Sequence, residues 1–223
     1  MPLVELDKIT KIYDQRKPNE FYALNGVDLS FQKGEFAAIM GISGSGKSTL
    51  MNIIGCLDKP TSGSYKFDGE EVTQKRHAEL VKIRRNRVGF IFQNFNLLPR
   101  RTALSNVELP LIYKSIRPKK RKILATRALE QVGLGSKLKH RPSMLSGGEQ
   151  QRVAIARAIV NEPVVILADE PTGNLDSKSG RQVMEMLRGL HQKGTTVIVV
   201  THDQKVAEYA QRIININDGK IVS

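Results

Sequence analysis

Gly41-Ile-Ser-Gly-Ser-Gly-Lys-Ser48 decides the fold of this chain, because its glycines, lysine and final hydroxyl have the spacing of a phosphate-binding loop. A short apolar run, Phe36 to Met40, precedes these residues and predicts a buried strand. The residues from Ser48 to about Leu57 predict a helix. A strand before and a helix after are the context in which such a loop cradles phosphate groups. We refer to residues 41–48 as the phosphate loop.

Each residue type in the phosphate loop has a chemical task. Glycines let successive backbone N–H groups turn inward around phosphate oxygens, and the following helix adds partial positive charge. Lys47 is predicted to reach the β- and γ-phosphates of a nucleotide, and the Ser48 hydroxyl is predicted to bind Mg²⁺. The nucleotide-binding residues expected from this segment are Gly41, Ser43, Gly44, Ser45, Gly46, Lys47, Ser48 and Thr49.

Two carboxylates, Asp169 and Glu170, end another apolar run, Val164 to Ala168. Asp169 would stand at the end of a buried strand beside the phosphate loop, where it suits Mg²⁺ directly or through a water molecule. Glu170 points differently and can polarise a water molecule against the γ-phosphate. Pro171 keeps Glu170 out of helical geometry. Alone this pair also fits an ordinary strand end, but together with Lys47 it indicates nucleotide hydrolysis.

Strands and helices alternate along most of the chain. Alternating apolar residues predict strands within residues 4–31. Further strands are expected at 88–92, 164–168, 196–200 and 213–217, with a helix near 177–191. This order is typical of an α/β fold with a largely parallel sheet covered by helices. Between about Phe95 and Ala158 the pattern is helical, with start signals at Pro118 and Ser146 and a stop at Gly133, which predicts an inserted subdomain.

Composition and charge limit the classes of protein. No apolar run in the 223 residues approaches the ~20 that a membrane-spanning helix needs, and the N-terminus lacks the shape of a signal peptide. The net charge is +13, and from Phe95 to Arg152 there are 13 Lys and Arg against 3 Asp and Glu, a net of +10. Nucleic acid, anionic lipid or a polyphosphate ligand would each explain this charge, and a solvated helix face is the plain alternative.

Leu145-Ser-Gly-Gly-Glu149 precedes a helix that continues through Arg157. Ser146 and Glu149 have the spacing of a capping box, which starts a helix. Two glycines in the first turn also leave N–H groups that can bind an anion, so the structural and functional interpretations are compatible. We refer to residues 146–149 as the signature loop.

The signature loop resembles the signature of ATP-binding cassette (ABC) ATPases, and it precedes the acidic pair at that family's distance. Gln93 resembles the glutamine of the family's Q-loop, and Asp176 in Gly173-Asn-Leu-Asp resembles its D-loop. His202 resembles its switch histidine, and Tyr13 resembles the aromatic residue that stacks on adenine. The resemblance covers essentially the whole chain, in order.

The resemblance implies an ATPase that binds ATP and Mg²⁺. The implied catalytic residues are Glu170, His202, Lys47 and Gln93, and the implied Mg²⁺ ligands are Ser48, Gln93 and Asp169. Nucleotide contacts are also implied for Tyr13, Ser146, Gly147, Gly148, Glu149 and Asp176. Glu149 departs from the family's commoner glutamine, which puts its side chain in doubt as a ligand. Phe21 and Tyr22 lie near Tyr13 and could replace it on adenine.

The resemblance also implies the fold and the partners. It predicts one ABC ATPase domain, with a P-loop NTPase core at 1–94 and 156–223, an N-terminal antiparallel β subdomain, and a helical subdomain at 95–155. Stretches such as Ile54-Gly-Cys-Leu-Asp-Lys-Pro and Asn106-Val-Glu-Leu-Pro look like the macrolide-exporter and lipoprotein-release group.

In that family two copies close around ATP as a homodimer, with the phosphate loop of one facing the signature loop of the other. The dimer drives a transmembrane permease subunit or a fused membrane domain. The resemblance therefore implies a cytoplasmic location, peripheral on the inner face of the cell membrane. We further expect the basic segment 119–122 to orient the subunit against anionic headgroups.

Two other functions stay open at this point. A soluble ABC protein acting on nucleic acid or ribosomes would suit the basic charge, but such proteins usually carry tandem cassettes, zinc modules or long coiled-coil insertions, for which 223 residues leave no room. We therefore expect no nucleic-acid partner. A structural tether with vestigial hydrolysis disagrees with the complete set of Lys47, Asp169, Glu170 and His202.

Overall fold

The computed structural model describes residues 1–13 and 20–222 and has an α/β architecture. Its strands are β1 (Pro2–Tyr13), β2 (Phe21–Gln32), β3 (Phe36–Met40), β4 (Ser62–Phe67), β5 (Glu70–Glu71), β6 (Val88–Ile91), β7 (Val165–Asp169), β8 (Thr196–Thr201), β9 (Arg212–Asn217) and β10 (Lys220–Ile221). Its helices are α1 (Lys47–Ile54), α2 (His77–Arg87), α3 (Ala103–Tyr113), α4 (Pro118–Gln131), α5 (Gly147–Ile159), α6 (Ser177–Gln192) and α7 (Gln204–Ala207). Short 3-10 turns lie at η1 (Gly135–Lys137) and η2 (Pro142–Met144).

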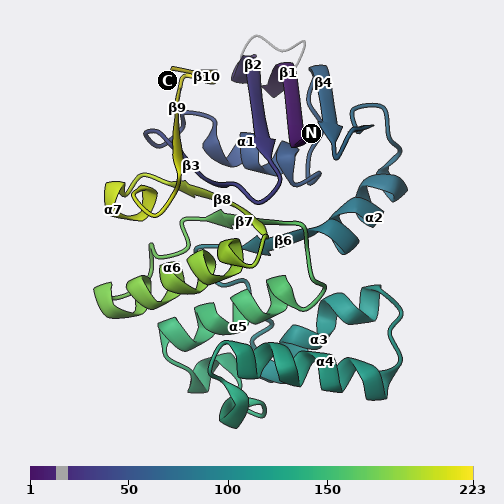
Figure 1. The fold of residues 1–223 in the computed structure, drawn as a ribbon, viewed down its shortest axis with the longest axis vertical. Helices are drawn as coiled ribbons and strands as arrows, with labels where there is room; N and C mark the ends of the chain where they lie inside the picture. Colours follow the sequence, from purple (N-terminus) through teal and green to yellow (C-terminus); the bar gives the residue numbers. More distant parts are fainter. Residues whose placement is uncertain (14–19, 223) are drawn as a thin grey trace.

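A six-stranded sheet of order β10-β9-β3-β8-β7-β6 crosses the middle of the molecule (Figure 1). All its neighbouring strands are parallel except the edge pair β9 and β10. Parallel neighbours bring the carboxyl ends of β3, β7 and β8 to one edge. That edge is where ligands bind in open α/β sheets. The expectation of a mostly parallel sheet is therefore confirmed.

A second sheet, of order β2-β1-β4-β5, is antiparallel and lies above the parallel one in Figure 1. Strand β1 pairs along its whole length with β2, and Tyr13 lies directly opposite Phe21. The alternation of apolar residues in this part of the chain buries one face, as at Val4, Leu6 and Ile9. The predicted N-terminal antiparallel subdomain is present.

The parallel sheet separates two hydrophobic cores. Successive side chains of a strand point to opposite faces, so the continuous apolar run of β7 serves both cores. Val165 and Leu167 pack with α1 and the antiparallel sheet. Ile166 and Ala168 pack with α6 and the helical part of the molecule. This division fixes the sheet between two layers, and it fixes the loops at the strand ends with it.

Helices α3, α4 and α5 pack against one another at the bottom of Figure 1 and share one core with α6. The predicted signals have their expected places, because Pro118 opens α4, Gly133 (φ 73°) follows its end, and Ser146 caps α5. The expected subdomain boundary between residues 155 and 156 falls inside α5. No helix among residues 1–13 and 20–222 has the length and apolar content to cross a membrane.

Two features of the fold differ from the sequence-based expectation. Helix α1 ends at Ile54 and not near Leu57, because the chain turns at Gly55 and at Cys56, whose φ is 56°. Helix α2 was not expected at all. Only Leu80 and Ile83 of its eleven residues are buried, so its sequence carries almost no apolar periodicity.

Candidate functional site

A cavity of about 680 Å³ opens where β3, β7 and β8 end. The side chains and backbone that line it come from the phosphate loop, the acidic strand end, and the segments after β6 and β8. They are Phe21, Ala23, Ile42, Ser43, Gly44, Gly46, Lys47, Ser48, Thr49, Gln93, Asp169, Glu170 and His202. Segments far apart in the sequence therefore meet at one site, as the motifs predicted.

At two glycines of the phosphate loop a Cβ would collide with a neighbouring backbone oxygen. Gly46 has φ 103°, and a Cβ there would lie 2.4 Å from the carbonyl oxygen of Ala23. At Gly41 a Cβ would lie 2.3 Å from the carbonyl oxygen of Ile216. Neither Gly41 nor the buried Ser45 lines the cavity, and the Ser45 hydroxyl has no hydrogen-bond partner among the described residues. Gly41 and Ser45 therefore shape the loop from behind.

The Lys47 side chain is buried and folds back onto its own loop. Its Nζ donates to the carbonyl oxygens of Gly41 at 2.7 Å and Ile42 at 2.6 Å. Burial lowers the pKa of its ammonium group, and the nearby carboxylates of Glu170 and Asp169 partly oppose that shift. The Lys47 ammonium group therefore lines the cavity, and the backbone of its own loop holds it in place.

Asp169 is the last residue of β7 and Ser48 is the second residue of α1, and both line the cavity. Burial raises the pKa of the Asp169 carboxyl, and the adjacent Glu170 carboxylate adds to the rise. Two carboxylates so close together favour the binding of a cation beside them. Carboxylate, hydroxyl and amide oxygens are the hard donors that Mg²⁺ prefers. The residues present therefore fit Mg²⁺.

No group of three or more His, Cys, Asp or Glu side chains that could hold a metal occurs in the described part of the chain. Such a group is not a requirement for Mg²⁺, which usually takes one or two protein carboxylates beside phosphate oxygens and water. Gln93 lines the same cavity and supplies a further amide oxygen.

Glu170 is held by the strand β8 from two directions. Its carboxylate accepts hydrogen bonds from the Thr201 hydroxyl and the His202 backbone N–H, both at 3.0 Å. His202 Nδ1 lies 2.6 Å from Glu170 Oε1, the same oxygen that accepts from the His202 N–H. The backbone of Glu170 has φ 43°, a conformation that costs a non-glycine residue of order 1 kcal/mol or more. Neighbouring contacts must hold this strained geometry in place.

Gln93 follows β6 and contacts the loop that follows Glu170. A Cβ at Gly173 would lie 2.7 Å from the Gln93 amide nitrogen, so a larger residue there would displace the Gln93 side chain. Asn174 Nδ2 donates to the Gln93 carbonyl oxygen at 3.1 Å and to Asn94 Oδ1 at 2.8 Å. The two loops on either side of the acidic strand end are therefore tied together.

The signature loop does not line the cavity of its own chain. Ser146 Oγ accepts from the Glu149 N–H at 3.3 Å, and Glu149 Oε2 accepts from the Ser146 N–H at 2.9 Å, so the predicted capping box is present. The Ser146 N–H holds the pKa of the Glu149 carboxyl below its usual range. Gly148 packs against the Ser179 side chain at the start of α6.

Asp176 also lies outside the cavity and serves as the N-cap of α6. Its carboxylate accepts from the N–H groups of Lys178 and Ser179 and from the Ser179 hydroxyl. These hydrogen bonds lower the pKa of its carboxyl. Its side chain is therefore fully engaged within its own chain.

The structure places Phe21, and not Tyr13, at the cavity wall. The Tyr13 hydroxyl donates to Asp58 Oδ2 at 3.1 Å, and the Lys11 ammonium lies 5.0 Å from its ring centre. Phe21 is Tyr13's cross-strand partner, and its side chain is 56% exposed beside the phosphate loop.

Two further residues at the site belong to none of the sequence motifs identified above. Thr201, which is fully buried, holds the Glu170 carboxylate. Gln151, also fully buried, donates to the carbonyl oxygen of Pro171. Both contacts join segments distant in the sequence, so no local pattern could have revealed them.

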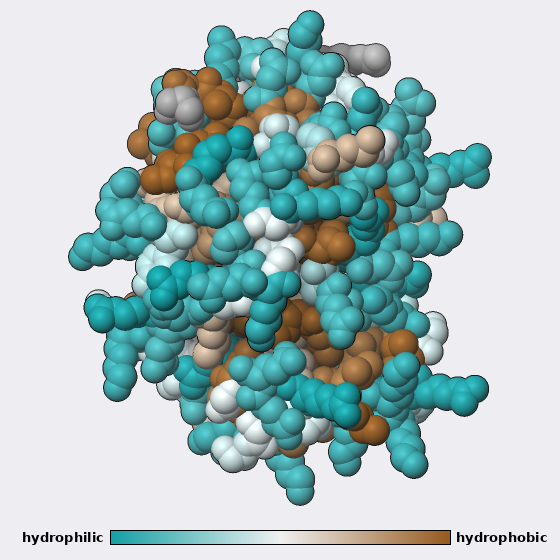
Figure 2. Space-filling model, in the orientation of Figure 1, coloured by the Kyte–Doolittle hydropathy of each residue, from teal (hydrophilic) through white to brown (hydrophobic). Residues whose placement is uncertain are grey.

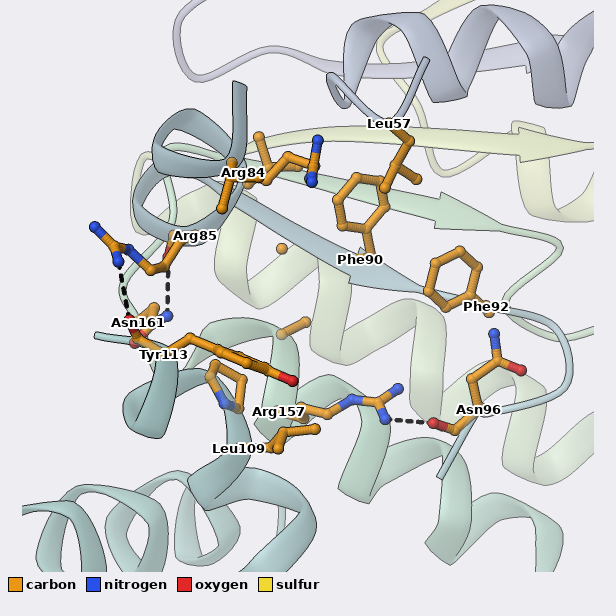
Figure 3. A pocket seen from close by; sticks show the side chains of 15 residues that line it. Leu57, Arg84, Arg85, Phe90, Phe92, Asn96, Leu109, Tyr113, Arg157 and Asn161 are labelled. Atoms are coloured by element: carbon orange, nitrogen blue, oxygen red, sulfur yellow. Dashed lines mark hydrogen bonds between the residues drawn. The ribbon is translucent and has the colours of Figure 1, made fainter. Parts of the chain in front are cut away.

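An apolar groove of about 570 Å³ lies between the parallel sheet and the helical part of the molecule (Figure 3). Phe90 and Phe92 stack on one wall with ring centres 5.7 Å apart, and Tyr113 of α3 stands opposite. The Arg157 guanidinium reaches the carbonyl oxygen of Asn96 at 2.5 Å. Since Phe92 and Asn96 flank Gln93 closely in the sequence, the groove adjoins the cavity at the strand ends.

Comparison with known proteins gives consistent matches. The model of the family described as ABC transporter matches residues 24–173. An ABC transporter ATP-binding protein of Bacillus subtilis, YknY, is 51% identical over 220 residues and covers 99% of this chain and 95% of its own length. The macrolide export ATP-binding/permease protein MacB of Azoarcus sp. is 53% identical over all of this chain, which spans 34% of that longer protein.

Solved structures match equally well. The ATP-binding cassette MJ0796, as a dimer in a post-hydrolysis state bound to ADP and Pi, superimposes with a TM-score of 0.91 at 49% identity. The match covers 99% of this chain and 97% of that one. The CbiO1 subunit of a transporter complex from Clostridium perfringens superimposes with a TM-score of 0.87 at 26% identity, covering 100% of this chain and 87% of that one.

Proposed function

The chain belongs to the ABC transporter family and is an ATPase that powers a membrane transporter, and from this premise we propose how its residues do so. One observation carries the proposal. Lys47, Asp169, Glu170 and His202 meet at one cavity, whereas the signature loop of the same chain lies outside it. No relative reported above is named for a nucleic-acid function, so the alternative partner gains no support.

In the proposed site ATP lies along the phosphate loop, with adenine on Phe21 in place of the expected Tyr13. The backbone N–H groups of the phosphate loop and the Lys47 ammonium hold the β- and γ-phosphates. Ser48, Gln93 and Asp169 would hold Mg²⁺, which neutralises charge on the phosphates. Nucleotide binding must draw the Lys47 ammonium away from the Gly41 and Ile42 carbonyls to which it now donates.

Glu170 is proposed as the residue that orients or deprotonates the attacking water. Its carboxylate is fixed by the Thr201 hydroxyl and the His202 backbone, so little motion is required at the moment of reaction. The His202 ring is exposed toward the cavity and would steady the γ-phosphate. Little covalent chemistry falls to the protein, because phosphoryl transfer depends mainly on positioning and charge stabilisation.

Two copies of the chain are required to complete a site. We propose that Ser146, Gly147 and Gly148 of one copy close over the γ-phosphate held by the other. The capping box leaves the signature loop stable without a ligand. The MJ0796 structures are dimers of the same fold. The signature loop belongs to the helical subdomain, which we propose as residues 95–155. In the proposed dimer this loop faces the cavity of the partner copy and not that of its own chain.

The apolar groove beside Gln93 is proposed as the seat of a short permease segment (Figure 3). The segment could belong to a separate subunit or, as in the MacB relative, to the same polypeptide. Export is the proposed direction, because that relative is named for macrolide export. Figure 2 shows one group of apolar residues over the lower, helical half of the face drawn and another at its upper left, on a surface that is elsewhere mostly hydrophilic.

The basic start of α4 is proposed to face anionic headgroups on the inner face of the cell membrane. Lys119, Lys120 and Lys122 are exposed, and no acid or side-chain cap offsets them in the first turn. Cations at a helix N-terminus oppose its dipole, so a solvated face gains nothing from them there. Arg121 differs, because its guanidinium reaches the Ile116 carbonyl and Glu108.

Vesicle binding tests this surface. Changing Lys119, Lys120 and Lys122 to Gln is expected to weaken salt-sensitive binding to anionic vesicles, since each cation near such a surface contributes about 1 kcal/mol. ATPase activity in solution should stay unchanged. Equal binding of parent and variant, or none by the parent, would show that the helix face is merely solvated.

The proposed reaction is tested by steady-state ATP hydrolysis with the purified chain. We expect activity that requires Mg²⁺ and rises cooperatively with ATP, because two composite sites form together. A hyperbolic ATP dependence in the absence of any dimer would count against the two-copy site.

A further inference from the structure

Gln151 is a fully buried polar residue on α5, one turn after the signature loop begins. Its Nε2 donates to the Pro171 carbonyl oxygen at 2.6 Å and, at 3.5 Å, approaches the Phe92 carbonyl oxygen. It lies on the same helix face as Gly147, four residues earlier, whose nearest neighbours include Leu175. One side chain thus joins the helix to both loops of the site.

The two carbonyls that Gln151 contacts adjoin proposed functional residues. Pro171 directly follows Glu170, whose φ of 43° needs external support. Phe92 directly precedes Gln93. Proline has no backbone N–H, so the Pro171 carbonyl is that residue's sole hydrogen-bonding group. The Gln151 amide therefore fixes the carbonyl group of the residue that follows the strained Glu170.

Packing alone does not explain an amide at this position. The Gln151 Oε1 atom is buried without a hydrogen-bond partner among the described residues. A buried unpaired oxygen costs free energy, and Met or Leu would avoid that cost but would leave the Pro171 carbonyl without its donor. The donor side of the amide is what the structure uses.

We propose that Gln151 is a positioning residue that holds the Glu170 loop and the end of β6 in register with the signature helix. The proposal rests on the proposed role of Glu170 in hydrolysis. Because the signature loop and Gln151 share one helix, the contact also ties the part of the chain that completes the partner's site to the part that acts in its own. Loss of the contact misplaces Glu170 without removing any group that holds ATP.

Two substitutions test the donor, and both are measured in the whole chain. Gln151→Met keeps the size and removes the donor, and we expect kcat to fall about 10-fold while KM for ATP changes less than about 2-fold. Gln150→Met is the matched control on the same helix, since its amide donates to the carbonyl oxygen of Leu145 at 3.1 Å and has no hydrogen bond to another loop in the described part of the chain. The control should keep kcat within about 2-fold of the parent.

Gln151→Glu gives a pH dependence of kcat that would not occur if Gln151 served only in packing. A carboxyl buried against the Pro171 carbonyl has a raised pKa, and its protonated form can again donate to that oxygen. The kcat of this variant relative to the parent should therefore rise as pH falls from about 8 to about 6, while the ratio for Gln151→Met stays flat.

Three outcomes decide the matter. A kcat for Gln151→Met equal to that of Gln150→Met overturns the proposal. A ratio for Gln151→Glu that does not rise at low pH also overturns it, and this variant decides if the Met variant no longer binds a fluorescent ATP analogue. Absence of Mg²⁺-dependent hydrolysis in the parent chain would instead contradict the proposed function, and it is measured first.

Discussion

The phosphate loop and the signature loop both place glycines at the N-terminus of a helix, yet the two helices are capped differently. Helix α1 begins after Gly46 with no side-chain cap and no acid in its first turn. Helix α5 begins after Ser146 with a complete capping box. The first N–H groups of a helix need partners, and a capping box supplies two of them internally. The N–H groups of the phosphate loop therefore need an anion as their hydrogen-bond acceptor. The signature loop is stable without a ligand, and only its glycine N–H groups remain to bind a nucleotide held by another copy.

Charge follows the same division. The uncapped loop carries the buried cation Lys47 and faces two carboxylates, so it is equipped to bind phosphate and metal. The capped loop carries the acid Glu149, whose carboxylate is occupied by the Ser146 N–H and approached by Lys137 at 3.9 Å. In the proposed site, one loop provides binding energy for the nucleotide, and the other closes over it. The predictions below test this division from the largest effect to the smallest.

Lys47→Ala should abolish the function of the phosphate loop. The variant loses the cation that neutralises the β- and γ-phosphates in a largely buried site, and we expect kcat/KM to fall about 10³-fold. Steady-state hydrolysis measures the loss, and far-ultraviolet circular dichroism checks that the fold survives. Turnover at the parent's rate would remove Lys47 from the site.

Glu170→Gln should separate binding from cleavage. A neutral amide keeps an oxygen that accepts from Thr201 but cannot take a proton from water, so kcat should fall about 10²-fold while ATP still binds. Size-exclusion chromatography should show a dimer with ATP and a monomer with ADP. A monomer under saturating ATP would contradict closure by the signature loop.

Phe21→Ala and Tyr13→Ala compare the two aromatic residues that face each other across β1 and β2. Phe21 lines the cavity and Tyr13 is bonded to Asp58, so we expect KM for ATP to rise about 5-fold for Phe21→Ala from lost stacking. Tyr13→Ala should change KM less than about 2-fold. The reverse order would restore Tyr13 as the adenine contact.

Glu149→Gln tests the cap on the other loop through pH. The folded pKa of Glu149 is depressed, so its charge stabilises the fold above the unfolded pKa, and this contribution is lost as pH falls through the folded pKa. Gln still accepts the Ser146 N–H, so the variant loses only the charge near the helix start, about 0.5 kcal/mol at pH 7 and less near pH 3. Urea unfolding at both pH values measures the difference, which should be absent if the box is not formed in solution.

The sequence predicted the elements whose physics is local. The phosphate loop, the parallel strands, and the starts of α4 and α5 at Pro118 and Ser146 all rest on short patterns that act within a few residues. Helix α2 could not be predicted, because only Leu80 and Ile83 lie on its buried side. What could not be predicted depends on chain segments meeting in space.

The site shows the same limit. Motif residues gathered at the strand ends as expected, because parallel strands bring their carboxyl ends together. The place of Phe21 follows from cross-strand pairing with Tyr13, and the contacts of Thr201 and Gln151 follow from tertiary packing. The left-handed backbone of Glu170 is likewise imposed by its surroundings, since Pro171 predicts only that the residue is not helical.

The central claim, that a site needs the phosphate loop of one copy and the signature loop of another, is tested most directly by mixing two defective chains. Gly147→Asp suits this purpose, because the nearest atom to a Cβ there is 3.5 Å away and an acid favours a helix start, yet its charge repels a polyphosphate. Lys47→Ala supplies the complementary defect. Both are made in the Glu170→Gln background so that cleavage does not dissolve the dimer.

Sedimentation velocity with ATP then gives the decisive readout. A mixed dimer contains one intact pair of loops, since the chain with a sound phosphate loop meets the chain with a sound signature loop. The account predicts monomers for each variant alone and an ATP-dependent dimer in the equimolar mixture. A mixture that stays monomeric, or a dimer formed by either variant alone, would contradict the shared site.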